Sequence, residues 1–160
     1  MIKLWKSLLL MGGLLLYSIQ PQAVDMKFSG NLIMPPPCQI NKGKDISVNF
    51  NKIGINKIDG DNYRQQLDFT LSCGPVSPWE LTLVLTTSNP ASFDDAAVQS
   101  DVPGLGIKVY IDNKPMYFKQ NYPIPDNTSP KLEAVPIKDK TQVLNTGTFS
   151  AAATLLAVYQ

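Results

Sequence analysis

The sequence predicts an all-β fold, built as a sandwich of short strands. Several short runs alternate apolar and polar side chains, which is the period of a strand with one buried face. Turn and loop signals at Gly74-Pro75, Asn89-Pro90 and Pro103-Gly104 separate these runs. No stretch beyond Ala23 keeps a helical period. Together these features are typical of a two-layered β domain.

The start of the chain, positions 1–23, has the layout of a secretory signal peptide. Lys3 and Lys6 give a positive start, residues 8–16 are apolar apart from two glycines, and small or polar residues follow. This run is far shorter than the roughly 20 residues that span a bilayer, which disfavours the alternative of an uncleaved anchor. Removing the leader leaves positions 24–160, and the formal net charge falls from +1 to −1 because both lysines leave with it. We therefore expect one domain, with no charge bias toward nucleic acid or an anionic membrane.

An alternating segment, residues 24–34, opens the mature chain. Apolar residues or Gly occupy its even positions, and polar residues occupy the odd positions from Asp25 to Asn31. The pattern predicts a strand with one buried face. Pro35, Pro36 and Pro37 then interrupt any ladder, because proline has no backbone N–H to donate. We expect residues 24–37 to form an extension that is separated by a stiff break from a domain of residues 38–160.

The chain has two cysteines, Cys38 and Cys73. In an oxidising compartment an even pair is most simply a disulfide. The alternative is two buried free thiols. A metal site is disfavoured, because the chain has no His and no third Cys.

The middle of the chain contains the other predicted strands. Alternation predicts strands over residues 46–50, 66–73, 79–85 and 107–111, with a turn at residues 112–114 leading to a strand over 116–118. Residues 132–137 are a weaker candidate, because Pro136 lies inside them. The inward positions are Ile46, Val48, Phe50, Leu67, Phe69, Leu71, Cys73, Trp79, Leu81, Leu83, Leu85, Ile107, Val109 and Ile111.

The last fourteen residues, 147–160, read as a full-length strand. The residues that fall on one face at a period of two are Phe149, Ala151, Ala153, Leu155, Ala157 and Tyr159. Because no later segment of this sequence can pair with it, one edge must be covered by an earlier strand or by another molecule. Both an intermolecular role and an ordinary core strand paired within the domain agree with the pattern.

These features together resemble the subunits of bacterial fimbriae built by the chaperone–usher route, the pilins. The resemblance rests on the alternating N-terminal extension, a Cys soon after it (PPPCQI), a second Cys about one strand later (DFTLSC) and the closing strand GTFSAAATLLAVYQ. Gly147, fourteenth from the end, and Tyr159, next to last, match the C-terminal motif of that family. The similarity covers the whole mature chain, and its two ends are the most specific parts.

The resemblance implies an incomplete immunoglobulin-like sandwich that lacks its last strand and so has a groove beside the C-terminal strand. A periplasmic chaperone would fill the groove first, and the extension of the next subunit would replace it as a donor strand at an outer-membrane usher. Main-chain hydrogen bonds would supply affinity, and alternate side chains would set the register. Because such a contact is head to tail and does not close, a filament on the cell surface would result.

Carried over by position, the donor face consists of Met26, Phe28, Gly30, Leu32 and Met34. The residues bordering the groove and contacting the chaperone would be Gly147, Phe149, Ala151, Ala153, Leu155, Ala157, Tyr159 and Gln160. Gly30 would let the donor backbone lie close to its partner. The terminal carboxylate would meet basic chaperone residues.

The position along the fimbria is less sharply indicated. Three prolines and a short extension favour a minor or tip-proximal subunit, with a chain terminator or a major pilin as alternatives. A mature chain of this length leaves no room for a separate receptor-binding domain.

Little in the sequence favours an enzyme. Without His there is no Ser-His-Asp or Cys-His arrangement. Asp94 and Asp95 are adjacent and so point apart, and residues 59–62 lack the later Glu of a calcium loop and read as a turn. Asn127-Thr128-Ser129 fits the pattern of a glycosylation acceptor, but a match of three residues is common by chance. We therefore expect no catalytic site, metal site, cofactor or small-molecule substrate, and a periplasmic ligand-binding sandwich is the remaining alternative.

Overall fold

The structure, a computed structural model, describes residues 24–74, 80–125 and 128–160. The predicted leader, Trp79 and Asn127 lie outside these residues. The chain divides after Ile33 into two units, and each is described by itself. In the first unit residues 24–33 form no strand, and their apolar side chains are exposed. The strand predicted over 24–34 is therefore unformed in the isolated chain.

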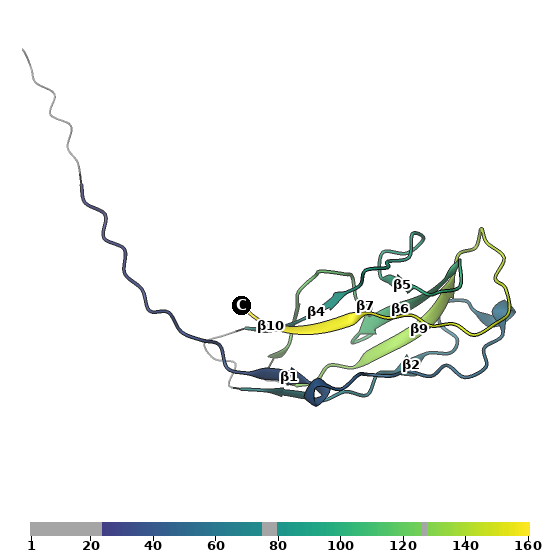
Figure 1. Ribbon diagram of the computed structural model, residues 1–160, viewed down its shortest axis with the longest axis horizontal. Helices are drawn as coiled ribbons and strands as arrows, with labels where there is room; N and C mark the ends of the chain where they lie inside the picture. Colours follow the sequence, from purple (N-terminus) through teal and green to yellow (C-terminus); the bar gives the residue numbers. More distant parts are fainter. Residues whose placement is uncertain (1–23, 75–79, 126–127) are drawn as a thin grey trace, which may run out of the picture. The chain divides into compact units, whose positions relative to one another are not determined.

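The second unit is all-β, as predicted, and its largest sheet has five strands (Figure 1). Four of them follow the order β2 (Gln65–Gln66), β9 (Leu132–Lys138), β6 (Leu105–Ile111) and β5 (Ala97–Gln99), and β7 (Lys114–Pro115) pairs with β6 as well. All of these pairings are antiparallel. The turn predicted at 112–114 joins β6 to β7, with Asp112 and Asn113 at positive φ of 46° and 64°. Residues 116–118, predicted as a strand, follow β7 without forming one.

A three-stranded antiparallel sheet forms the second layer, in the order β10 (Thr154–Tyr159), β4 (Leu81–Thr86) and β8 (Tyr122–Pro123). A third pairing joins β1 (Cys38–Ile40) to β3 (Leu71–Cys73), and the predicted disulfide between Cys38 and Cys73 links these two strands. The described residues also contain two single 3-10 turns, η1 (Asn41–Gly43) and η2 (Ile55–Lys57). In the part of the chain described, no helix is long and apolar enough to span a bilayer.

The main core lies between the two larger sheets. Its buried members are Leu81, Leu83, Leu85, Val109, Ile111, Met116, Ile124 and Leu132. Most were predicted as inward positions of strands, and β4 is buried along nearly its whole length because it is the central strand of its sheet. Burying a side chain of this size contributes about 1.5–3 kcal/mol. This core is the base on which the candidate site is built.

Two elements differ from prediction for identifiable reasons. Residues 66–73 alternate as predicted, but they split into β2, paired with β9, and β3, paired with β1. Conversely, β9 is a full strand despite Pro136. The Leu67 N–H donates to the Leu132 carbonyl, so the backbone groups of Leu132 point away from β6. Pro136 lies four residues further along β9, and by alternation its backbone nitrogen and carbonyl point away from β6 as well. Because β2 ends before it reaches Pro136, the missing N–H removes no ladder bond.

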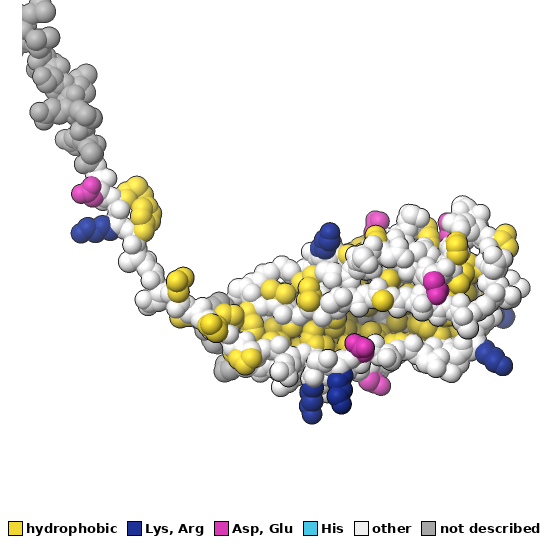
Figure 2. Space-filling view, in the orientation of Figure 1, with side chains coloured by type: hydrophobic (Ala, Val, Ile, Leu, Met, Phe, Trp, Pro, Cys, Tyr) yellow, Lys and Arg dark blue, Asp and Glu magenta, His cyan; other side chains and the backbone are white. Residues whose placement is uncertain are grey.

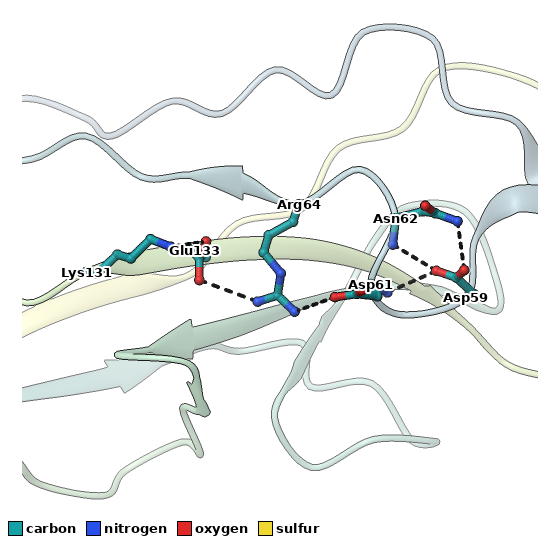
Figure 3. Close-up of polar contacts among 6 residues, drawn as sticks. All are labelled: Asp59, Asp61, Asn62, Arg64, Lys131 and Glu133. Atoms are coloured by element: carbon teal, nitrogen blue, oxygen red, sulfur yellow. Dashed lines mark hydrogen bonds and ion pairs between the residues drawn. The ribbon is translucent and has the colours of Figure 1, made fainter.

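A buried acid occupies the other face of β9 (Figure 3). The Glu133 side chain is 6% exposed. Its carboxylate forms an ion pair with Lys131 Nζ at 2.7 Å and a longer one with the Arg64 guanidinium at 3.5 Å. Arg64 also stacks 4.4 Å from the Tyr110 ring centroid. The Arg64 pKa is raised, chiefly by its hydrogen bond to Asp61. Since a buried carboxylate needs partners, these contacts account for Glu133 without a chemical role.

The residues read as a turn, 59–62, do form one. The Asp59 carboxylate accepts the backbone N–H groups of Asp61 and Asn62 at 3.0 and 2.8 Å (Figure 3). These bonds hold the pKa of Asp59 below its usual value. The carboxylate therefore closes its own loop.

Candidate functional site

An open groove of about 1190 Å³ runs along the domain between its two layers. One wall is formed by residues 43–53, which we call wall one, and the other by residues 144–155, which we call wall two. The floor is apolar and consists of Leu85, Leu105, Ile107, Val109, Leu132 and Ala134. Figure 2 shows the corresponding band of hydrophobic side chains along the domain. The groove is thus a long apolar channel rather than a compact ligand pocket.

Wall one is strand-like in its side chains but not in its hydrogen bonds. Ile46, Val48 and Phe50 are half-buried, and the residues between them are exposed, as predicted. The predicted strand over 46–50 is nevertheless wrong for the isolated chain. Among the described residues, no backbone group from 46 to 50 takes part in a backbone–backbone hydrogen bond. Alternation fixes a face, whereas a strand also needs a neighbour at about 4.8 Å.

Wall two likewise has the side-chain pattern of a strand but is hydrogen-bonded as one only from Thr154 onward. The strand predicted over 147–160 is shortened to β10, Thr154–Tyr159, which pairs with β4 from Thr154↔Thr86 to Tyr159↔Leu81. Of the predicted face, Phe149, Leu155, Ala157 and Tyr159 are half-buried against core clusters, whereas Ala151 and Ala153 are exposed in the groove. Gly147 also lines the groove. Gln160 extends the ladder through two backbone bonds with Glu80.

The outer edge of β10 has no strand partner in its sheet, and its first residues, Thr154 and Leu155, line the groove. Gln160 and Glu80 exchange N–H···O bonds of 2.8 and 3.1 Å, so they are a hydrogen-bonded pair of the antiparallel ladder. By alternation, the backbone groups of Leu155 and Ala157 point away from β4. Because β10 ends its sheet, these groups present an edge that can accept another strand.

A carboxylate positions the part of wall two that has no ladder. Asp101 accepts the backbone N–H of Ser150 at 2.8 Å and its hydroxyl at 2.9 Å, and the Asp101 N–H donates to the Ser150 carbonyl at 3.0 Å. The Ser150 donors hold the pKa of Asp101 below its usual value. Sequence reasoning missed this clamp, because an Asp before a Pro-Gly loop signals only a turn.

The two walls meet at one end through aromatic rings. The Phe50 and Phe149 centroids lie 6.0 Å apart with the rings tilted by 33°. At the other end, β1 lies beside β10, and the Tyr159 hydroxyl is 3.4 Å from the Gly74 carbonyl. Wall one follows β1 in the chain, β1 lies beside β10, and Phe50 lies beside Phe149, so wall one runs antiparallel to wall two.

The side chains of the predicted donor strand are exposed in the isolated chain. Phe28 is 84% exposed, and Met26, Leu32 and Met34 are likewise exposed. A Cβ built on Gly30 meets no heavy atom within 4 Å. The pairing of these residues with a groove stays a prediction.

The remaining chemistry-bearing groups do not form a site. In the described ranges, no group of three or more Cys, Asp or Glu residues is placed to hold a metal ion. Asp94 is paired with Lys108 Nζ at 2.7 Å. The groove is therefore the main feature that needs a functional explanation.

Comparison with known proteins gives the family. Residues 26–160 match the fimbrial protein family. The chain is 41% identical over 144 residues to the fimbrial-like protein YfcQ of Escherichia coli K12, covering 85% of this chain and 87% of that one. It is 32% identical over 130 residues to the fimbrial-like protein YfcR of the same organism, covering 79% of this chain and 75% of that one.

Solved structures show the same fold. The P pilus rod subunit PapA aligns with a TM-score of 0.62 at 18% identity, covering 84% of this chain and all of that chain. The P pilus adaptor subunit PapF aligns with a TM-score of 0.59 at 20% identity, covering 79% and 98%. The fold is the incomplete immunoglobulin-like sandwich of pilus subunits. The chain therefore belongs to the fimbrial protein family, a family of structural subunits rather than enzymes.

Proposed function

We propose that the chain polymerises by donor-strand exchange, using the apolar groove to accept a strand and residues 24–34 to donate one. The observation that carries the proposal is the pair of unpaired edges along the groove. Wall one has alternating half-buried side chains and no backbone partner among the described residues from 46 to 50. In β10, Leu155 lines the groove, and the backbone groups of Leu155 and Ala157 point away from β4. One inserted strand would satisfy both edges and cover the apolar floor.

Length and pattern support the extension as that strand. Residues 24–34 span about 36 Å when extended at about 3.3 Å per residue, and wall two, which includes Gly147 and Leu155, is of similar length in residues. Met26, Phe28 and Leu32 lie on one face at a period of two, with Gly30 between them. The extension therefore offers apolar side chains at the spacing that the groove requires.

A periplasmic chaperone would occupy the groove before the neighbour does. Without an occupant, the edge of β10 stays unpaired and the apolar side chains of wall one, Ile46, Val48 and Phe50, stay only half-buried. Such surfaces aggregate. The chaperone would add a strand along β10 and bind the terminal carboxylate of Gln160 through basic residues. The usher would then exchange it for the extension of the next subunit, so that the chain passes through the periplasm to the cell surface.

Within the fimbria, we assign the chain to a minor or tip-proximal position. The three prolines before Cys38 make the extension shorter and stiffer than a long flexible arm. A fimbria assembled with a labelled copy, imaged by immunogold electron microscopy, tests this assignment. Label restricted to tips or to rare sites supports it, and label along the whole rod indicates a major pilin.

The test of strand acceptance is complementation in cis. A copy of residues 24–34 is appended after Gln160 through a short flexible linker, which lets it run antiparallel to β10. We expect a soluble monomer with a cooperative melt, whereas the chain without the copy aggregates when separated from its chaperone. The matched control carries Phe28→Asp in the appended copy, which buries an unpaired charge. Equal behaviour of the two fusions would contradict the proposal.

A further inference from the structure

The backbone where the extension leaves the domain is fixed by close contacts. Cys38 of β1 lies opposite Cys73 of β3, and the Gly74 N–H donates to the Pro37 carbonyl at 3.1 Å, which continues the pairing one step outward. A Cβ on Gly74 would collide with the Pro36 ring. Pro36 therefore packs directly against the Gly74 backbone, and the chain is held from Pro36 into β1.

The prolines also fix the backbone on the other side of this anchor. The ring of each proline restricts φ to a narrow negative range, and a residue before proline is kept in the extended region. Met34, Pro35 and Pro36 all precede a proline. The last residue of the donor face is therefore locked into an extended backbone where it joins the domain.

This exit lies beyond the Leu155 end of the groove, where the Tyr159 hydroxyl is 3.4 Å from the Gly74 carbonyl. For the extension to enter the groove of its own chain, the backbone must reverse between Met34 and Cys38 and then run parallel to β10. A tight reversal of this kind uses two residues that commonly have positive φ, typically Asn-Gly. Only Pro35, Pro36 and Pro37 are available there, and none of them can adopt that geometry.

We propose that Pro35–Pro37, anchored by the packing of Pro36 on Gly74, keep the extension out of the groove of its own chain. The donor strand is thereby reserved for the groove of a neighbouring subunit, and an unfilled groove stays open to a partner. This inference rests on the proposed function, because it takes the groove as a strand acceptor.

The test supplies the missing turn. In the full mature chain, Pro35→Asn and Pro36→Gly together place Asn-Gly at the exit. After refolding without chaperone, we expect this variant to be a monomer whose melting temperature is independent of concentration, whereas the unaltered chain aggregates. Adding Phe28→Asp to the variant should restore aggregation, because the inserted strand would then bury a charge. A variant with Pro35→Ala and Pro36→Ala, which loses the prolines without gaining a turn, should give less monomer than the Asn-Gly variant.

Two results would overturn the inference. One is an unaltered chain that folds alone as a stable monomer and loses that stability when residues 24–34 are deleted, since its own extension would then enter despite the prolines. The other is an Asn-Gly variant that aggregates like the unaltered chain while the same variant with a donor copy after Gln160 is a stable monomer. In that case the prolines are not what keeps the extension out of its own groove, although the groove still accepts a strand. If the copy after Gln160 also fails in the unaltered background, the proposed function itself fails.

Discussion

Replacing Phe28 in the donor strand should weaken the filled groove without affecting the empty subunit. In the isolated chain Phe28 is 84% exposed, so Phe28→Ala removes no packing there. In a filled groove its ring would be buried against an apolar floor that includes Val109 and Leu132. Truncating a buried Phe to Ala costs about 3–5 kcal/mol. We take about 3 kcal/mol, because the groove is open on one side, which corresponds to a roughly hundredfold loss in the equilibrium constant for insertion.

The assay uses the fusion that carries a donor copy after Gln160. Phe28→Ala is made only in the appended copy, and the free energy of unfolding is measured by denaturant titration. The matched control is Ile33→Ala in the same copy. Ile33 is also apolar and 61% exposed, but it lies at an odd position and so on the opposite face of the strand. We expect its effect to stay within about 0.5 kcal/mol.

A second control places Phe28→Ala in the native extension of the same fusion, where it should leave the free energy of unfolding unchanged. The reasoning is refuted if Phe28→Ala and Ile33→Ala in the appended copy cost the same, because the even face would then not be the buried one. It is refuted equally if neither substitution matters while the fusion is still stabilised, since side chains would then play no part in insertion.

Three further predictions concern the two ends and the domain. Gly30→Val should leave chaperone co-purification intact but block incorporation into fimbriae, whereas Leu155→Asp should abolish chaperone capture; the reverse pattern would exchange the roles of the two ends. Replacing both cysteines by serine should destabilise the donor-filled domain by about 2–4 kcal/mol, and an unchanged denaturation midpoint would contradict this. Hydrogen bonds from Ser150 lower the pKa of Asp101 in the folded chain. The ionised Asp101 therefore stabilises the fold at a pH above the pKa of an unfolded Asp, about 4, and this stabilisation is lost as the pH falls below that value. Asp101→Asn should flatten that part of the profile of the denaturation midpoint against pH, and an unaltered profile would mean that the clamp is not stabilising.

The sequence determined the face of each strand better than its extent. A period of two predicted Leu81, Leu83, Val109 and Ile111 as inward side chains, and all four are buried. In β4 the intervening Thr82 and Val84 are buried as well, which alternation did not predict. The positions of the two cysteines, together with the inferred export, were enough to predict the disulfide. These features depend on local pattern and on composition, which a single sequence carries in full.

Only the tertiary structure decided which predicted strands have partners. Residues 46–50 alternate clearly and 147–153 were predicted as part of the last strand, yet neither segment forms a ladder, because hydrogen bonding depends on a neighbour that alternation does not specify. The converse holds for β9, where Pro136 argued against a strand and the short reach of β2 made the proline harmless. The clamp between Asp101 and Ser150 joins segments that are far apart in the sequence and has no local signature. The groove is therefore a property of what the fold leaves unpaired, and only the structure showed that it is open.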